Sequence, residues 1–90
     1  MPGTPLTDSY RNEIENDIVN AMLEGLDNHR IDMNDYDKIK KHVLDNLDGK
    51  VLTHAQMYFF LEDLVNRWPI FNLMWQKHKS SLQLLVQRYG

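Results

Sequence analysis

The stretch from Thr53 to Trp75 constrains the fold more than any other part of the chain. It holds both tryptophans, all three phenylalanines and one of the four tyrosines. Apolar residues recur in it at the spacing of one helix face, so a helix here has a single broad apolar stripe. The stripe consists of Met57, Phe60, Leu61, Leu64, Val65 and Trp68. We therefore expect a helix of about Thr53–Trp68 to be the central helix, against which the other helices pack.

Both ends of this helix have clear signals. Thr53 and Gln56 have the spacing of a capping box, in which each side chain bonds the other residue's backbone N–H, and Leu52 can pack on Met57 as a hydrophobic staple. Pro69 cannot donate a backbone hydrogen bond and restricts the residue before it. We therefore expect a break or sharp kink at Pro69.

Two helices are expected before Thr53. The first begins at Thr7 or Asp8 and ends near residues 27–29, and Gly25 either weakens its last turn or lets another segment approach closely. Its stripe is Tyr10, Ile14, Ile18, Met22 and Leu26, widened by Val19 and Leu23. The second begins after Asp32 or Asn34 and stops at Gly49. Its buried face is Tyr36, Ile39, Val43 and Leu47, with Leu44 at the edge.

The last segment, residues 69–89, is a fourth helix, or two helices if Ser80 and Ser81 interrupt it. Ninety residues suit one domain, and we expect a flexible lead-in over residues 1–6 and a single helical domain over residues 7–90. The fold class is therefore predicted to be all-α, a compact bundle of four helices, or of five with the serine break.

Motifs for catalysis and for cofactor or metal binding are missing. The four histidines have no helical zinc spacing, no serine lies in a nucleophile elbow, and the four glycines form no phosphate loop. We expect a non-enzymatic protein without cofactor or metal. The absence of cysteine, of a secretory signal and of a long apolar run points to the cytoplasm.

Charge is distributed unevenly along the chain. All 13 acidic residues lie between Asp8 and Asp63, whereas only cations follow. This basic patch consists of Arg67, Lys77, Lys79 and Arg88. Two interpretations stay open: the basic segment docks on its own acidic body, or it meets an acidic partner or surface. Four cations support nucleic-acid binding too weakly for us to expect it.

Phe59 does not fit the core pattern. Its helical neighbours Gln56, Glu62, Asp63 and Asn66 are polar, so it should point away from the stripe that buries Phe60. The ring then contacts a partner or a second part of the same protein, or has no role. Aromatic anchors dominate many protein interfaces. We predict a binding surface formed by Tyr58, Phe59, Trp68, Phe71 and Trp75.

The sequence thus predicts a small interaction domain that acts by protein–protein contact, as a regulator, adaptor or subunit. It leaves open whether the partner is another protein or a second copy in a homodimer. The alternative is peripheral binding to an anionic membrane through the basic amphipathic segment 69–89.

Overall fold

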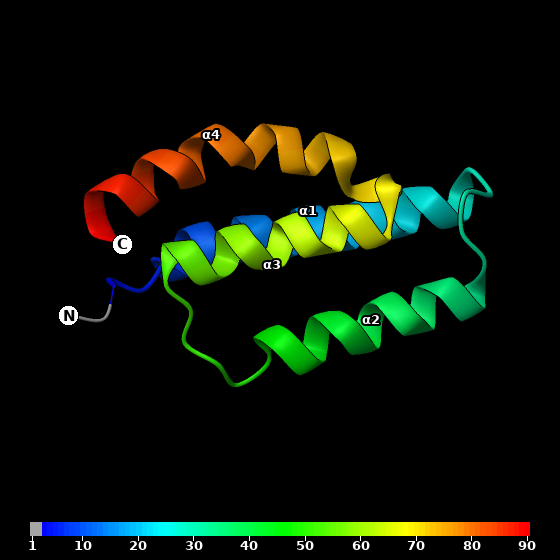
Figure 1. Ribbon diagram of the computed structural model, residues 1–90. Coiled ribbons are helices and arrows are strands. Elements are labelled where there is room, and N and C mark those ends of the chain that lie inside the picture. Colours follow the sequence, from blue (N-terminus) through cyan, green and yellow to red (C-terminus); the bar gives the residue numbers. More distant parts are fainter. Residues whose placement is uncertain (1–2) are drawn as a thin grey trace.

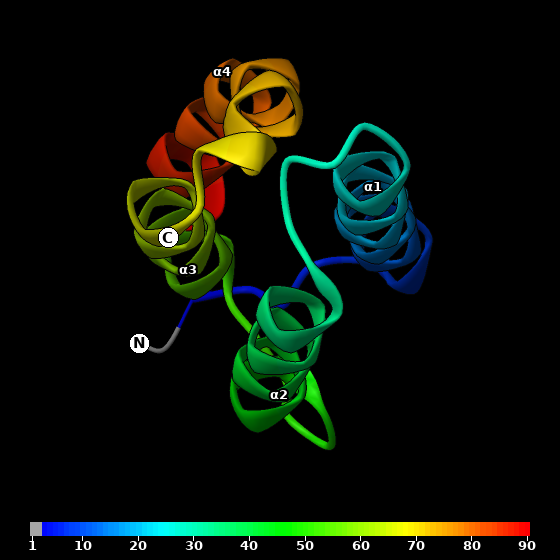
Figure 2. The ribbon, with the colours of Figure 1, turned by 90° about the vertical axis from the view of Figure 1, so that its right-hand side faces the viewer.

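Four α-helices and one 3-10 turn make up the structure, a computed structural model that describes residues 3–90 (Figure 1). The helices are α1 (Asp8–Asp27), α2 (Met33–Leu47), α3 (His54–Arg67) and α4 (Asn72–Tyr89), and the turn η1 (Pro69–Phe71) leads into α4. Successive helices run in opposite directions, and the end-on view in Figure 2 shows them arranged around a common core. The prediction of an all-α bundle is confirmed.

Side-chain caps fix where the helices begin. The predicted capping box of α3 is present, since the Gln56 backbone N–H donates to Thr53 Oγ1 at 3.2 Å and the Thr53 N–H donates to Gln56 Oε1 at 3.0 Å. Asp32 and Asp35 form a second box at the start of α2. Thr7 caps α1 by accepting the N–H three residues on. These bonds satisfy backbone donors that have no partner inside the helix.

A glycine and a proline mark where two of the helices end. Gly49, after α2, has φ +68°, a conformation that glycine adopts without a Cβ clash. Trp68 is extended (φ −133°, ψ 100°), and Pro69 opens the 3-10 turn, so the predicted break is confirmed. Ser80 and Ser81 lie inside a continuous α4. The five-helix alternative is therefore wrong, because neither serine interrupts that helix.

The core takes side chains from every helix, and α3 supplies the most. Its five buried residues are His54, Met57, Phe60, Leu61 and Leu64, compared with two from α2, Ile39 and Leu47. The backbones of α3 and α4 lie close together along the bundle. In position, α3 is one of four helices around the core (Figure 2). It is the central helix only in the sense that it contributes the most buried residues.

Gly25 lies where two other segments approach α1. A Cβ atom built on it would be 3.0 Å from Ile31 Cγ1 and 3.3 Å from Ile70 Cδ1. A side chain there would push against both isoleucines. Of the two roles predicted for this glycine, the structure supports the close approach.

Residues 4–6 of the lead-in contact the helical bundle. Leu6 is buried in the core, its N–H donates to the Leu52 carbonyl at 3.1 Å, and the Thr4 N–H donates to the Tyr89 carbonyl at 3.1 Å. Leu6 thus anchors residues 4–6 to the bundle, and the flexibility of the lead-in stays a prediction. The part of that prediction on Met1 and Pro2 lies outside the described residues.

We predict that Thr53→Ala lowers the free energy of unfolding by about 1 kcal/mol, since it leaves a backbone donor of α3 without its cap. For a domain of this size that is a fall in Tm of roughly 4–8 °C. Ser81→Ala, on the exposed side of α4, is the control and should leave Tm nearly unchanged. Equal melting temperatures for Thr53→Ala and the wild type would contradict the capping role.

Candidate protein-binding surface

Phe59 lies on α3 with its ring in solvent. Its exposed fraction is 63%, whereas the adjacent Phe60 is 9% exposed. Neighbouring residues on a helix point about 100° apart, so one ring can enter the core while the next cannot. The prediction that Phe59 points away from the buried stripe is confirmed.

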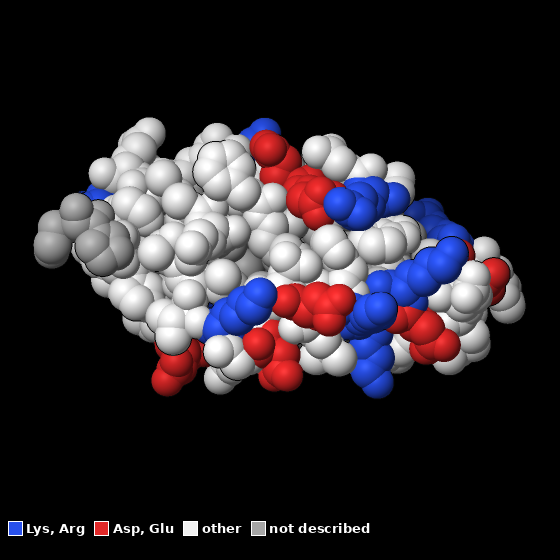
Figure 3. All heavy atoms as spheres, turned by 60° about the horizontal axis from the view of Figure 1, so that its bottom comes forward, with Lys and Arg blue, Asp and Glu red and all other residues white. Residues whose placement is uncertain are grey.

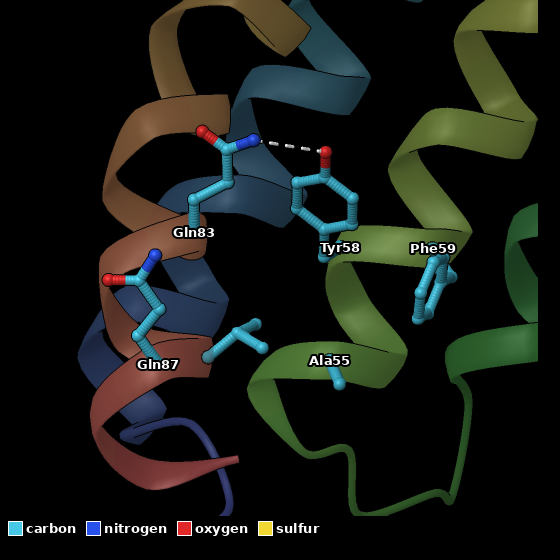
Figure 4. Close-up of a pocket in the computed structure, with 6 residues that line it drawn as sticks. Ala55, Tyr58, Phe59, Gln83 and Gln87 are labelled. Atoms are coloured by element: carbon cyan, nitrogen blue, oxygen red, sulfur yellow. Dashed lines mark hydrogen bonds between the residues drawn. The ribbon is translucent and has the colours of Figure 1, made fainter.

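A groove lies beside this ring, between α3 and α4 (Figure 4), and we call it the Phe59 groove. It has a volume of about 370 Å³. Its lining is Ala55, Tyr58 and Phe59 from α3 and Gln83, Val86 and Gln87 from α4. Tyr58 points towards α4, where Gln83 Nε2 donates to its hydroxyl at 3.4 Å. The small side chain of Ala55 leaves room between the two helices.

The aromatic wall of the groove is braced from the core. The Tyr58 ring packs edge-on against Trp75, with 5.0 Å between ring centroids, and the Phe59 ring stands perpendicular to Tyr58 at 5.5 Å. Trp75 is only 8% exposed. Lys79 Nζ lies 5.9 Å from the Trp75 ring centroid, a cation–π contact on the solvent side. The groove is therefore preformed, because buried contacts hold Tyr58 in place.

The five predicted binding residues do not form one surface. Tyr58 and Phe59 line the groove, whereas Phe71 is fully buried and Trp75 is nearly so, so these two rings are not on the surface beside Phe59. Both sit on the inward face of the last segment, packed in the core. Trp68 is partly buried at the C-terminal end of α3. Its ring and the His42 ring meet in an edge-to-face arrangement, with 5.5 Å between ring centroids.

The predicted basic patch is dispersed as well. Arg67 pairs with Asp63 at 3.0 Å on α3, and Lys77 pairs with Asp17 of α1 at 2.9 Å. Lys79 covers Trp75, and Arg88 lies exposed in the last turn of α4. On the face shown in Figure 3, which brings the α2 side forward, cations and acids lie next to one another and a broad area carries no charge. The pairing of Lys77 with α1 supports the interpretation that the basic segment docks on its own acidic body.

A buried polar network joins α1 to α4. His78 is 2% exposed, its Nε2 lies 2.6 Å from Asp17 Oδ2, and its Nδ1 lies 3.1 Å from the Tyr10 hydroxyl. If Nε2–H donates to the carboxylate, Nδ1 accepts from tyrosine, and all three groups are satisfied. Sequence reasoning missed this network. The signal was the position of His78 on the same helical face as Met74 and Leu82.

The network shifts two acid–base equilibria. Burial, followed by the nearby carboxylates of Glu13 and Asp17, raises the pKa of the Tyr10 hydroxyl above its ordinary value. Burial alone would raise the pKa of Asp17, but the hydrogen bonds from Lys77 and His78 outweigh it and hold that pKa below the ordinary value. Asp17 therefore stays charged in the folded protein. The network thus links α1 to α4 through hydrogen bonds.

Three further observations concern metal ligands, membrane spans and known proteins. Among residues 3–90, no group of His, Asp or Glu side chains is arranged to hold a metal ion. None of the helices described here combines the length and apolar character needed to cross a membrane. No model of a known protein family matches the chain, and no solved structure gives a significant match.

Phe59→Ala is expected to change the free energy of unfolding by less than about 0.5 kcal/mol, because the ring is mostly in solvent. Phe71→Ala is the buried counterpart and should cost about 3–5 kcal/mol by leaving a cavity. Urea unfolding of both variants measures the difference. A comparable loss for Phe59→Ala would show that its ring belongs to the core.

Acid should destabilise the protein through Asp17. Its folded pKa is lowered, so its contribution is present above the unfolded pKa of about 3.9 and is lost as pH falls through the folded value. Asp17→Asn should lose about 1–3 kcal/mol at pH 7 and show a flatter fall in stability below pH ~4. Lys77→Met, which removes only the exposed partner, should lose less. Parallel pH profiles for Asp17→Asn and wild type would contradict this account.

Proposed function

We propose that the protein is a non-enzymatic helical interaction domain that binds another protein through the Phe59 groove. One observation carries the proposal: a phenylalanine that is 63% exposed stands on the rim of a preformed groove. Covering a phenylalanine ring contributes about 1.5–3 kcal/mol. This equals roughly ten- to hundred-fold in Kd, enough for one residue to dominate a modest interface.

The shape of the groove favours a helix as the bound element. Two antiparallel helices form its walls, and the apolar side chains of Ala55, Tyr58 and Val86 lie between them. An amphipathic helix can place apolar side chains one turn apart along such a groove. The amides of Gln83 and Gln87, also one turn apart on α4, offer hydrogen-bonding groups beside it. The partner proposed here is therefore an amphipathic helical segment.

The charge of α4 favours acidic residues on one edge of that segment. No acidic residue occurs in α4, whereas Lys79 precedes Gln83 by one turn on the same side of the helix. A carboxylate near Lys79 gains an ion pair, and a cation there meets repulsion. We include a cytoplasmic location in the proposal because the chain has no cysteine.

Selection from a displayed library of amphipathic helical peptides tests the proposal. Peptides that bind the wild type should bind Phe59→Ala at least tenfold more weakly and should be enriched in acidic residues on one edge. Leu73→Ala is the matched control, because Leu73 is 78% exposed on α4 but does not line the groove. Selected peptides that bind wild type and Phe59→Ala equally would overturn the proposal.

A membrane surface is the competing ligand class. Met74, Trp75 and Leu82 of α4 are buried in the bundle, so the proposal favours a protein partner over lipid. Sedimentation with vesicles of phosphatidylcholine and phosphatidylserine is the matching test. We expect no binding at low salt; binding that high salt reverses would favour the membrane instead.

A further inference from the structure

A second groove, which we call the α1–α2 groove, lies on another side of the bundle. Its volume is about 270 Å³. The apolar part of its lining is Ile18, Val19 and Met22 from α1 with Tyr36, Val43, Leu44 and Leu47 from α2. Val19 and Leu44 are 46% and 49% exposed, and Leu23, one turn after Val19, is 46% exposed. Large apolar side chains thus stand together in solvent on both helices.

Nothing else in the described chain covers this groove. Figure 2 shows α1 and α2 side by side with α4 on the far side of the bundle from α2. Only Ile39 and Leu47 of α2 are fully withdrawn into the core. At one end Arg11 pairs with Glu15 at 2.8 Å and donates to the backbone carbonyls of Leu47 and Lys50. These contacts tie α2 to α1 and leave the outer side of the pair open.

The charged side chains along α2 indicate which partner fits the groove. Lys40 and Leu44 lie one turn apart on α2, and Asp48, the residue directly after the helix, follows four positions later. All three line the groove, with the leucine midway. Lys40 and Asp48 are exposed, and the ion pairs found among residues 3–90 involve neither of them. The part of α2 that lines the groove, together with the residue after it, therefore places a cation and an anion on either side of Leu44.

We propose that the α1–α2 groove is the interface of a homodimer in which the two α2 helices pair antiparallel about a two-fold axis at Leu44. That axis places Lys40 of each copy opposite Asp48 of the other copy, so the pair occurs twice. It also places the two Leu44 side chains against each other. A parallel pairing would place like charges together and is disfavoured. Complementarity of this face with itself selects a second copy as the occupant.

A homodimer of standard size would cover only a small part of the protein's surface. A standard interface buries about 800 Å² per partner. The protein exposes 5975 Å² in all, so such an interface takes a little over a tenth of its surface. The Phe59 groove lies between the other two helices and remains free in the dimer. The inference therefore stands apart from the proposed function.

Charge reversal tests the pairing by the mass of the protein in solution. The wild type should shift from monomer to dimer with concentration in sedimentation equilibrium. Lys40→Asp and Asp48→Lys should each raise the dimer Kd at least tenfold, because each places like charges opposite each other. An equal mixture of the two variants should form a heterodimer with both ion pairs restored, and the double variant should dimerise like the wild type.

Controls separate this outcome from unfolding and from the other groove. Lys38→Asp reverses a charge on another side of α2 and should leave the dimer Kd unchanged. Circular dichroism checks that every variant is folded, and peptide binding by the Phe59 groove should persist in Lys40→Asp. A wild type that stays monomeric at millimolar concentration would overturn the inference, as would a mixture that fails to recover the dimer, or a dimer abolished by Phe59→Ala instead.

Discussion

The packing of α3 against α4 is the constraint on which the rest of the structure depends. The turn at Pro69 reverses the chain directly after α3, so α4 runs back alongside α3 in the opposite direction. Phe71, fully buried, sits inside this turn and fixes it. The apolar stripe of α3 then faces the inner side of α4, and α1 and α2 close the remaining sides of the core. A helix that continued straight through Trp68 would leave both stripes in water.

This packing also explains why one ring stays outside. Antiparallel helices in contact share a core on one side and form a surface furrow on the other. Phe60 and Leu61 face the core, whereas Ala55, Tyr58 and Phe59 face the furrow. The Phe59 groove is thus a direct product of the helix pair. Because the buried Trp75 ring packs against the Tyr58 ring, the stability of the core and the shape of the groove are linked.

Local signals in the sequence account for most of the fold. The capping box at Thr53, the glycine stop at Gly49 and the break at Pro69 each depend on neighbouring residues only, and each is present. The burial of Phe71 and Trp75 could not be predicted from local signals, because an apolar stripe does not reveal which part of the protein, or which partner, covers it. The link between His78 and Asp17 spans 61 positions and depends on how α1 and α4 meet. Leu6 likewise docks through contacts with residues distant in the sequence.

The central claim is that α3 divides its aromatic residues between a core and a free surface, and fluorine NMR tests it most directly. The chain has only three phenylalanines, so uniform labelling with fluorophenylalanine gives three signals to assign. Changing the solvent from H2O to D2O should shift the Phe59 signal and leave those of Phe60 and Phe71 almost unmoved. Three signals that ignore the solvent, or a shift at Phe71 instead, would contradict the account.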